Sequence, residues 1–458
     1  MESQLRTRRR DMDMLHGALW NKLPLFALPV AATAILEQLF NASDIAVVGN
    51  FSGSAKTAAV AAVGANSPII SLLVNLFVGI ALGANVVIAN AIGRGDQEDV
   101  QKAVHTSVVT AVICGIVVSI FGQLAAAPLL QSLQVPEDVL PLALSYLRIY
   151  LVGMPVILLY NFEAAIFRSV GNTKVPLMVL AISGVLNVGL NLFFVIVLHM
   201  TVNGVAIATV ISNGISALAL FWILTRSTQV IRICPRKLGI DRRILGHILK
   251  IGLPAGLQSA VFCISNIVIQ SAINSLGKEV MAASSAAYNI EIIAYDVLNS
   301  FGQACTTFVG QNCGAGQNSR CRRVLGLCIL EDGLISALFI AVILFFGKPL
   351  LSLFTRDPQV IALGYTRMVI VFFAYIFSLF YENLSGYLRG FGISLVPAIL
   401  AAGGICVVRI LWIETAFPLH RSFQTILVGY PISLGVTALL MGIAALAYHP
   451  SRRHGAAS

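Results

Sequence analysis

Charge is the property that this sequence has least of. Asp, Glu, Lys and Arg make up 11% of the 458 residues, whereas apolar residues make up 57%, and the mean hydropathy is +0.87. A soluble protein of this length needs about twice that share of charged residues. The composition therefore excludes a soluble globular chain and favours an integral membrane protein.

Motifs for nucleotide, metal and redox chemistry are also missing. There is no G-x-x-x-x-G-K-[ST], so the chain carries no ATPase of its own. The eight cysteines form no Cys-x-x-Cys and have no neighbouring His pair, which argues against a zinc or redox site. No Ser/His/Asp or Cys/His grouping is recognisable, because most of the seven His lie at the termini or in loops. We therefore expect neither an enzyme nor a bound cofactor.

Long apolar runs, by contrast, recur along the whole chain. A membrane-spanning helix needs about 20 mostly apolar residues, whereas a transmembrane barrel would need alternating segments of roughly ten residues, which are absent. The pattern predicts an all-α membrane protein with twelve transmembrane helices. The apolar stretches are 22–49, 58–91, 103–124, 139–166, 175–198, 204–225, 249–275, 281–312, 324–346, 358–386, 397–416 and 423–448.

Basic residues fall mainly in alternate connections between these stretches. With the N-terminus placed in the cytoplasm, the inside segments hold 22 of the 30 Lys and Arg residues and the outside loops hold five. This asymmetry follows the positive-inside rule. It predicts a multi-pass protein of the inner (cytoplasmic) membrane with both termini cytoplasmic. It also accounts for the net charge of +10 without nucleic acid as a partner.

An internal repeat divides the chain into halves. The segment LYNFEAAIFRSVGNTKVP at 159–176 is matched by FYENLSGYLRGFGISLVP at 380–397, 221 residues later, and the same offset relates IGRGD to CGAGQ. Each half holds six spans, an even number, so both enter the membrane in the same direction. This predicts two six-helix bundles related by a pseudo-two-fold axis along the membrane normal, an arrangement known in transporters. The predicted parts are an N-terminal tail 1–21, a first bundle 22–225, a basic cytoplasmic linker 226–248, a second bundle 249–448 and a tail 449–458.

Polar side chains within the first-half spans are candidates for ion coupling, because ionisable groups at membrane depth are costly and by default functional. Glu37, Asn41 and Asp44 are spaced i, i+4 and i+7 and share one helix face. A carboxylate close to amide and hydroxyl oxygens suits a hard cation, and equally a proton. The cation-coupling candidates are Asp44, Glu37, Asn41, Asn187, Asn191 and Thr209.

The second half has its own polar residues within the apolar stretches. Amides and hydroxyls there can equally be hydrogen-bonding contacts between helices, whereas a buried carboxylate without an adjacent Lys or Arg favours a function. Asp44 and Glu37 are the leading examples of such carboxylates. The candidates for the substrate cavity or a second-half site are Asn266, Gln270, Glu291, Tyr295, Asp296 and Glu382.

The sequence resembles the multidrug and toxic compound extrusion (MATE) transporters of prokaryotes over nearly its whole length. The motifs that carry the resemblance are LEQLFNASDIAVVG, ANAIGRGD, GVAIATVIS, GQNCGAGQ and LRGFG. The resemblance implies two six-helix bundles around a V-shaped central cavity, and exchange of organic, often cationic, drugs for Na⁺ or H⁺. It implies that Asp44 is the coupling residue and that a transported Na⁺ is held by Asp44, Asn187 and Thr209. Asn191 departs from the family pattern, because many relatives have aspartate there, and this puts a two-carboxylate proton mechanism in doubt.

The function expected is a secondary antiporter. It would export small organic compounds, cationic and amphipathic, in exchange for Na⁺ or H⁺ by alternating access, as a monomer in the lipid bilayer with small-molecule substrates as partners. One alternative is a flippase or exporter of lipid-linked or anionic metabolites, which a cavity rich in Arg and Lys would favour. A non-transporting membrane subunit or a membrane enzyme would need a partner-binding domain or a catalytic constellation, and the sequence shows neither.

Overall fold

The computed structural model describes residues 12–53, 56–133, 135–448 and 450. The basic residues Arg6, Arg8, Arg9 and Arg10 of the predicted N-terminal tail, and Arg452 and Arg453 of the C-terminal tail, lie outside the described residues.

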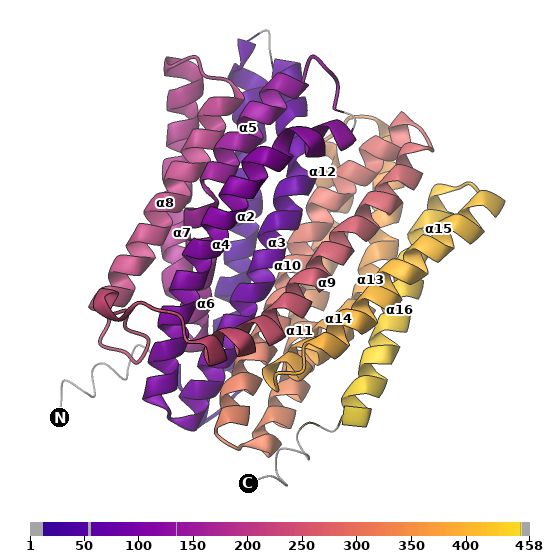
Figure 1. Cartoon of the computed structure of the whole chain (residues 1–458). Helices are drawn as coiled ribbons and strands as arrows, with labels where there is room; N and C mark the ends of the chain where they lie inside the picture. The colour runs from indigo at the N-terminus through magenta and orange to yellow at the C-terminus, as the bar shows by residue number, and fades with distance from the viewer. Residues whose placement is uncertain (1–11, 54–55, 134, 449, 451–458) are drawn as a thin grey trace. The chain divides into compact units, whose positions relative to one another are not determined.

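Helices account for almost all of the regular structure, and no strand occurs in the described ranges. Figure 1 shows their order along the chain. The α-helices are α2 (Lys22–Phe51), α3 (Lys56–Arg94), α4 (Gln97–Ser132), α5 (Leu140–Val152), α6 (Met154–Ser169), α7 (Lys174–Leu192), α8 (Val202–Arg226), α9 (Arg242–Asn274), α10 (Lys278–Gly314), α11 (Asn318–Phe345), α12 (Gly347–Ser352), α13 (Pro358–Gly390), α14 (Leu395–Ala401), α15 (Val408–Leu419) and α16 (Phe423–Tyr448). Two π-helices, η2 (Phe193–Val197) and η4 (Ala402–Val407), and one 3₁₀-helix, η3 (Pro235–Lys237), complete the set.

All twelve predicted spans lie on helices. Among the described residues, ten helical segments are long and apolar enough to cross a membrane, and the bent pair α5 and α6, with a 50° break, makes an eleventh. The break falls at Gly153, which is followed by Met154 and Pro155. The twelfth span is α10, which is 37 residues long but less apolar than the others because it carries Glu279, Glu291 and Asp296. The predicted all-α fold with twelve transmembrane helices is therefore confirmed.

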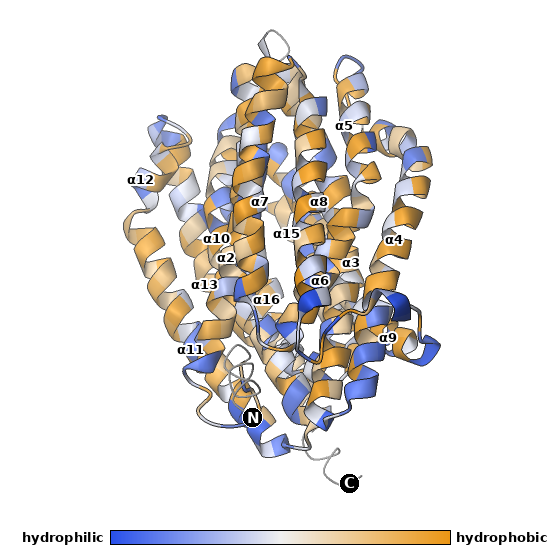
Figure 2. Ribbon diagram, turned by 90° about the vertical axis from the view of Figure 1, so that its left-hand side faces the viewer, coloured by the Kyte–Doolittle hydropathy of each residue, from blue (hydrophilic) through white to orange (hydrophobic). Residues whose placement is uncertain are grey.

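Apolar side chains face outward along many of these helices. On α4, for example, Ile116, Ile120, Phe121 and Leu124 are exposed, which is unfavourable in water but suits a hydrocarbon surround. In Figure 2 the long helices are mostly orange, and the segment that leads into α9 is blue. This distribution matches a chain whose polar residues lie at helix ends and in connections.

The chain forms two compact units, with Ala32–Leu253 in the first and Asp13–Ala31 together with the residues from Pro254 on in the second. Two helices belong to both units, because α2 passes from the second to the first at Ala32 and α9 passes back at Pro254. The predicted bundle limits place the boundary between the halves in the linker, and they stay a prediction.

The internal repeat is visible in the backbone. Gly95 and Gly171 have φ of 73° and 80°, and their repeat partners Gly316 and Gly392 have φ of 70° and 79°. These values lie in the left-handed region that glycine adopts at the ends of helices. The hydrogen bonds recur as well: Gly171 N donates to Arg168 O at 2.9 Å, and Gly392 N donates to Arg389 O at 2.8 Å.

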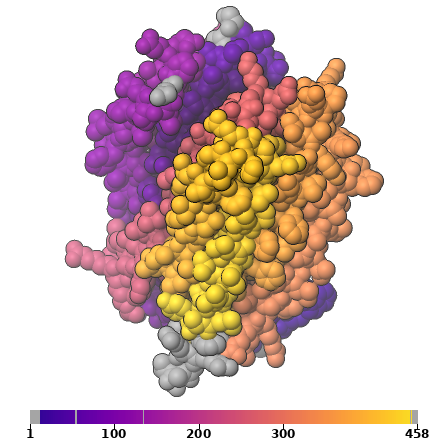
Figure 3. Space-filling model, turned by 90° about the vertical axis from the view of Figure 1, so that its right-hand side faces the viewer, coloured from indigo at the N-terminus to yellow at the C-terminus, as the bar shows by residue number. Residues whose placement is uncertain are grey.

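Each unit has its own apolar core. In the first unit, buried side chains of α3, α4, α6 and α8 pack together around Phe162 and Phe167. In the second unit, α10 packs against α13, and α13 against α16. The C-terminal helices α14 to α16, yellow in Figure 3, cover one face of this second unit.

Candidate functional site

Asp44 lies inside the first unit and accepts hydrogen bonds from two other helices. Its side chain is 5% exposed. Asn191 Nδ2 of α7 donates to Asp44 Oδ1 at 2.5 Å, and Thr209 Oγ1 of α8 donates to Asp44 Oδ2 at 3.1 Å. The structure thus brings together three of the predicted cation-coupling residues.

Local packing explains why α2 reaches α7 at this point. Gly184 of α7 has no side chain, and the ring of Phe40 occupies that space, so that a Cβ on Gly184 would lie 1.8 Å from Phe40 Cζ. Phe40 precedes Asp44 by one helical turn, and Gly184 precedes Asn191 by two turns. The close contact between the two helices therefore places the carboxylate beside the amide.

Further oxygens surround this contact. Asn187 accepts from Asn191 Nδ2 at 3.2 Å, and Asn187 Nδ2 lies 3.4 Å from both Thr209 Oγ1 and Ser212 Oγ. Asn191 Oδ1 is buried and has no hydrogen-bond partner. Carboxylate, amide and hydroxyl oxygens are the ligands that hard cations prefer.

No basic side chain that the structure describes neutralises Asp44. Of the residues that the structure describes, none forms an ion pair with it; the four ion pairs are His16–Asp13, Arg94–Asp99, Lys102–Glu98 and Arg367–Glu291. A buried carboxylate with only neutral partners is costly as an anion unless it binds a cation or a proton. We name this group, formed by Asp44, Asn187, Asn191 and Thr209, the Asp44 site.

The other two first-half candidates lie outside these contacts. Glu37 and Asn41, both on α2, have exposed side chains. Glu37 also interacts electrostatically with Arg168 of α6. Arg168 is 131 positions away in the sequence, so a sequence-local count of charges does not include it.

In the second unit, Glu382 of α13 binds two tyrosines. Tyr295 OH of α10 donates to Glu382 Oε1 at 2.6 Å, and Tyr381 OH donates to the same oxygen at 2.5 Å. The two hydroxyl oxygens are 3.1 Å apart. The structure thus joins two of the second-half candidates, Tyr295 and Glu382.

Glu291 is part of a buried ion pair. Arg367 of α13 donates from Nε to Glu291 Oε1 at 2.9 Å and from Nη2 to Glu291 Oε2 at 2.9 Å. A third donor, Nη1, bonds Ser284 Oγ at 2.7 Å. Both charged side chains are almost inaccessible, at 2% and 3% exposure. Glu291 is therefore not an unpaired carboxylate, and its partner could not be found from neighbouring sequence because Arg367 lies on another helix, 76 residues later.

The remaining second-half candidates differ in their surroundings. Asn266 of α9 accepts from Arg409 Nη1 at 3.3 Å. Gln270 is exposed and donates to Asn274 Oδ1 at 2.8 Å. Asp296 is partly buried on α10.

Two further buried carboxyl groups are not among the predicted site residues. Asp332 of α11 accepts from Ser336 Oγ at 2.8 Å and from Asn383 Nδ2 at 2.7 Å. Glu163 of α6 is 0% exposed, and neither of its oxygens has a hydrogen-bond partner. The signal that could have found Glu163 is its position inside the apolar stretch 139–166.

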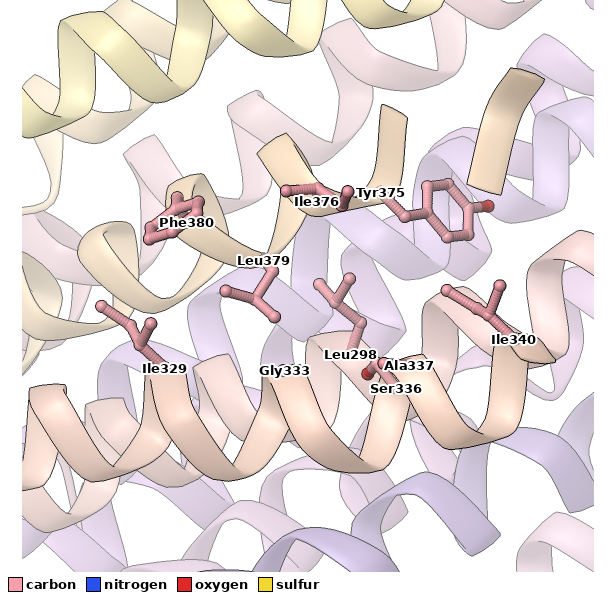
Figure 4. A pocket seen from close by; sticks show the side chains of 10 residues that line it. All are labelled: Leu298, Ile329, Gly333, Ser336, Ala337, Ile340, Tyr375, Ile376, Leu379 and Phe380. Atoms are coloured by element: carbon pink, nitrogen blue, oxygen red, sulfur yellow. The ribbon is translucent and has the colours of Figure 1, made fainter. Parts of the chain in front are cut away.

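A separate pocket of about 260 Å³ lies between α10, α11 and α13. Its lining is almost entirely apolar, and Figure 4 shows side chains of α11 and α13 pointing toward one another across it. Its one aliphatic hydroxyl, on Ser336, already donates to Asp332. The hydroxyl of Tyr375 donates to the backbone oxygen of Glu291 at 3.3 Å, and no charged side chain lines the pocket. Among the described residues, no three His, Cys, Asp or Glu side chains gather in a way that could hold a metal.

The fold is that of a polytopic helical membrane protein with polar groups buried inside its units. The MatE family model matches the chain twice, at residues 29–193 and 254–413. The chain belongs to the MatE family of multidrug efflux transporters.

Curated relatives and a solved structure agree with this assignment. The chain is 27% identical to the probable multidrug resistance protein YoeA of Bacillus subtilis, over 93% of each chain. It is 24% identical to an FAD transporter of Shewanella oneidensis, over 85% of this chain and 86% of the relative. A crystal structure of MATE in complex with MaD3S has the same fold, with a TM-score of 0.87 at 20% identity, over 96% of this chain and 98% of the other.

Proposed function

We propose that the protein is a secondary active antiporter that exports small organic compounds in exchange for Na⁺ or H⁺ by alternating access. The observation that supports this is the buried Asp44 carboxylate, which has amide and hydroxyl partners and no basic one. The ion exchanged at the Asp44 site is a transported substrate and not a resident cofactor. The proposed setting is the inner membrane, with both termini cytoplasmic and the chain acting as a monomer.

The Asp44 site can drive export because its occupancy changes the charge of the interior. An empty, ionised site is costly at this depth, and a bound Na⁺ or proton removes that cost. If the two transport conformations differ in their affinity for the ion, binding shifts the balance between them. Asn191 fits Na⁺ better than a two-carboxylate proton site, because its unpartnered Oδ1 is a neutral oxygen ligand.

The charge of the exported compound depends on different residues. The expectation of cationic cargo rests on carboxylates in the spans, but Glu291 is neutralised by Arg367 and Glu382 is bonded by two tyrosines. The alternative, export of anionic compounds, is favoured by Arg409, a buried cation in the second unit. The FAD transporter of Shewanella oneidensis is a relative whose substrate carries phosphate groups.

The test is Asp44→Asn, which keeps the size of the side chain and removes its charge. We expect ion-driven dye efflux to be lost while membrane insertion and thermal stability are retained. Glu37→Gln is the matched control, because Glu37 is on the same helix but exposed, and it should weaken efflux less. Efflux is measured in proteoliposomes under separate Na⁺ and H⁺ gradients. Full ion-driven efflux by Asp44→Asn would refute the assignment of the coupling site.

A further inference from the structure

Arg409 is a cation that the second unit buries without a carboxylate partner. Its side chain is 2% exposed. It lies near the middle of the 25-residue span Leu395–Leu419, ten residues before the end, which is about 15 Å along a helix. No ion pair in the described part of the chain includes Arg409.

The groups that contact this guanidinium are neutral. Arg409 Nε donates to Ser433 Oγ at 3.0 Å, and Nη1 donates to Asn266 Oδ1 at 3.3 Å. Its Cζ lies 4.5 Å from the ring centre of Tyr430 and 5.5 Å from that of Phe262. Ring faces attract a cation, but a buried guanidinium without an anion remains strongly unfavourable at membrane depth.

Neither nearby acidic group of the second unit forms an ion pair with Arg409. Glu291 pairs with Arg367, whose Cζ lies 5.6 Å from the same Tyr430 ring. Glu382 accepts from two tyrosine hydroxyls. Two cations therefore share one aromatic ring, and only one of them has a carboxylate.

The backbone directs Arg409 into the unit. The π-helix η4 ends at Val407, two residues before Arg409. A π-helical turn holds about one extra residue and rotates the next residues by roughly 100° relative to a continuous α-helix. Gly404 of η4 fits against α16, where a Cβ would lie 2.2 Å from Thr437 Oγ1. π-helical insertions in helices are frequent at functional sites.

We propose that Arg409 binds the anionic group, a carboxylate, sulfonate or phosphate, of an aromatic amphipathic compound that the protein exports. Asn266 and Ser433 orient the guanidinium, and the rings of Phe262 and Tyr430 contact the apolar part of the ligand. The proposal rests on the proposed function, because a site this buried is reached only through the conformational change of an alternating-access cycle.

Two dyes that share a tricyclic ring system but differ in charge test the proposal. Fluorescein is an anion and rhodamine 123 is a cation at pH 7.5, and binding of each to the purified full-length protein is followed by fluorescence polarisation. Wild type should bind fluorescein, and Arg409→Gln should weaken this binding about tenfold or more, as loss of a charge-assisted contact does. Rhodamine 123 binding should be unchanged or tighter, and Arg409→Lys should keep part of the fluorescein affinity.

A second variant leaves Arg409 in place. Asn266→Asp puts a carboxylate 3.3 Å from the guanidinium, so the protein acquires an internal counter-ion. Fluorescein affinity should fall about tenfold while thermal stability rises. If Arg409 only holds α9 and α16 together, the Asn266→Asp variant should gain stability and bind fluorescein as wild type does. That result would overturn the proposal. It can be obtained even if Arg409→Gln does not fold.

Two further experiments identify the source of the anion and distinguish failure of the anion site from failure of the proposed antiport. In phosphatidylcholine nanodiscs, displacement of fluorescein by added phosphatidylglycerol identifies a lipid headgroup as the ligand, whereas displacement only by phenyl phosphate identifies a soluble anion. Asp44→Asn should abolish ion-driven efflux of either dye and retain fluorescein binding. Ion-driven rhodamine 123 efflux without any fluorescein binding would overturn the anion site and leave the antiporter standing.

Discussion

At the scale of single residues, some buried charged side chains have a partner of opposite charge and others do not. Glu291 and Arg367 neutralise each other through three hydrogen bonds. Asp44 and Arg409 have only neutral partners, and the two lie in different halves of the repeat. Removing one partner of a buried pair is strongly destabilising, whereas a charge without a partner is available to a ligand from outside the chain.

The ion pair makes a prediction about stability. Glu291→Gln removes the partner of Arg367 and leaves a buried guanidinium uncompensated, so we expect a loss of about 3–5 kcal/mol in the free energy of unfolding. Replacing both residues, with Glu291→Leu and Arg367→Met together, should recover most of this loss. Thermal unfolding in detergent measures both variants. Equal stability of Glu291→Gln and wild type would mean that the pair does not form.

The residues that sequence reasoning found and missed differ in one physical respect. Helical spacing places Glu37, Asn41 and Asp44 on one face, and the resemblance to a family implied that Asp44 acts with Asn187 and Thr209, residues that the structure brings together with Asn191. Partners across helices, such as Arg367 for Glu291, depend on which helices touch and at what height. Neither periodicity nor composition of a single chain contains that information.

At the scale of helices, close crossings are made where glycine lets two backbones meet. Gly83 of α3 faces the N-terminal end of α9, where a Cβ would lie 2.4 Å from Ile248 O and 2.7 Å from Gly252 N. Because these atoms belong to the backbone, they cannot move aside without separating the helices.

This crossing can be tested within one helix. Gly83→Ala should destabilise the protein by about 1–3 kcal/mol, the range for overpacking a close contact. Gly64→Ala is the matched control on α3, because nothing lies within 4 Å of its Cβ position, and alanine should raise helix stability by up to about 1 kcal/mol. Thermal unfolding of the two variants measures this difference. Equal shifts in melting temperature would contradict the close crossing.

The segment between the halves is attached to α4. Cys234 N donates to His105 Nε2 at 3.0 Å, and Asp241 N donates to Thr106 Oγ1 at 3.0 Å. Asp241 then accepts from the backbone amides of Ile244 at 3.0 Å and Arg243 at 2.9 Å, at the start of α9. The predicted basic linker 226–248 therefore already contains the first turns of α9.

The Asp241 cap has a pH dependence. The hydrogen bond from Ile244 N lowers the pKa of the carboxyl below its ordinary value of 3.8. The contribution of the ionised Asp241 cap to the free energy of unfolding is therefore fully present above pH 3.8. It is lost as the pH falls through the lower pKa of the folded state. Asp241→Ala should be less stable than wild type at pH 7, with a difference that shrinks below pH 3.8. Asp241→Asn caps the helix without titrating, so its cap should not lose stability as the pH falls. A stability difference between Asp241→Ala and wild type that stays constant at all pH values would count against the cap.

Helix positions were predictable from hydropathy, but their ends and irregularities were not. The apolar stretch 103–124 extends as α4 over Gln97–Ser132. The N-terminal extension, QEDVQK, is polar, and a polar helix end beyond the bilayer core leaves no hydropathy signal. The π-helices η2 and η4 also lack a sequence signal, although each adjoins a polar group of functional interest. Their geometry depends on packing against neighbours, as at Gly404.

At the scale of the whole molecule, the two halves of the repeat share backbone geometry but differ in the charged side chains at matched positions. The helix ends at Gly171 and Gly392 have the same φ to within a degree. Near the start of each half the offset between the repeats is 225 instead of 221, and it relates Asn41 to Asn266 and Asp44 to position 269. Asp44, in contrast, is matched by Ile269, and Arg409 by Val188. At these two positions the duplicated scaffold carries a carboxylate in the first unit and a guanidinium in the second, as the two proposed ligands of opposite charge require.

This asymmetry predicts how the membrane potential acts on transport. An organic anion that leaves while a monovalent cation enters carries at least two positive charges inward per 1:1 cycle, and each is worth about 2.3 kcal/mol per 100 mV. An inside-negative potential should therefore accelerate fluorescein efflux, whereas 1:1 exchange of rhodamine 123 for a monovalent cation moves no net charge and should respond little. Proteoliposomes with a K⁺ gradient and valinomycin measure both dyes at fixed ion gradients, with Asp44→Asn as the uncoupled control. Equal responses of the two dyes would mean that anion and cation do not travel in opposite directions in one cycle.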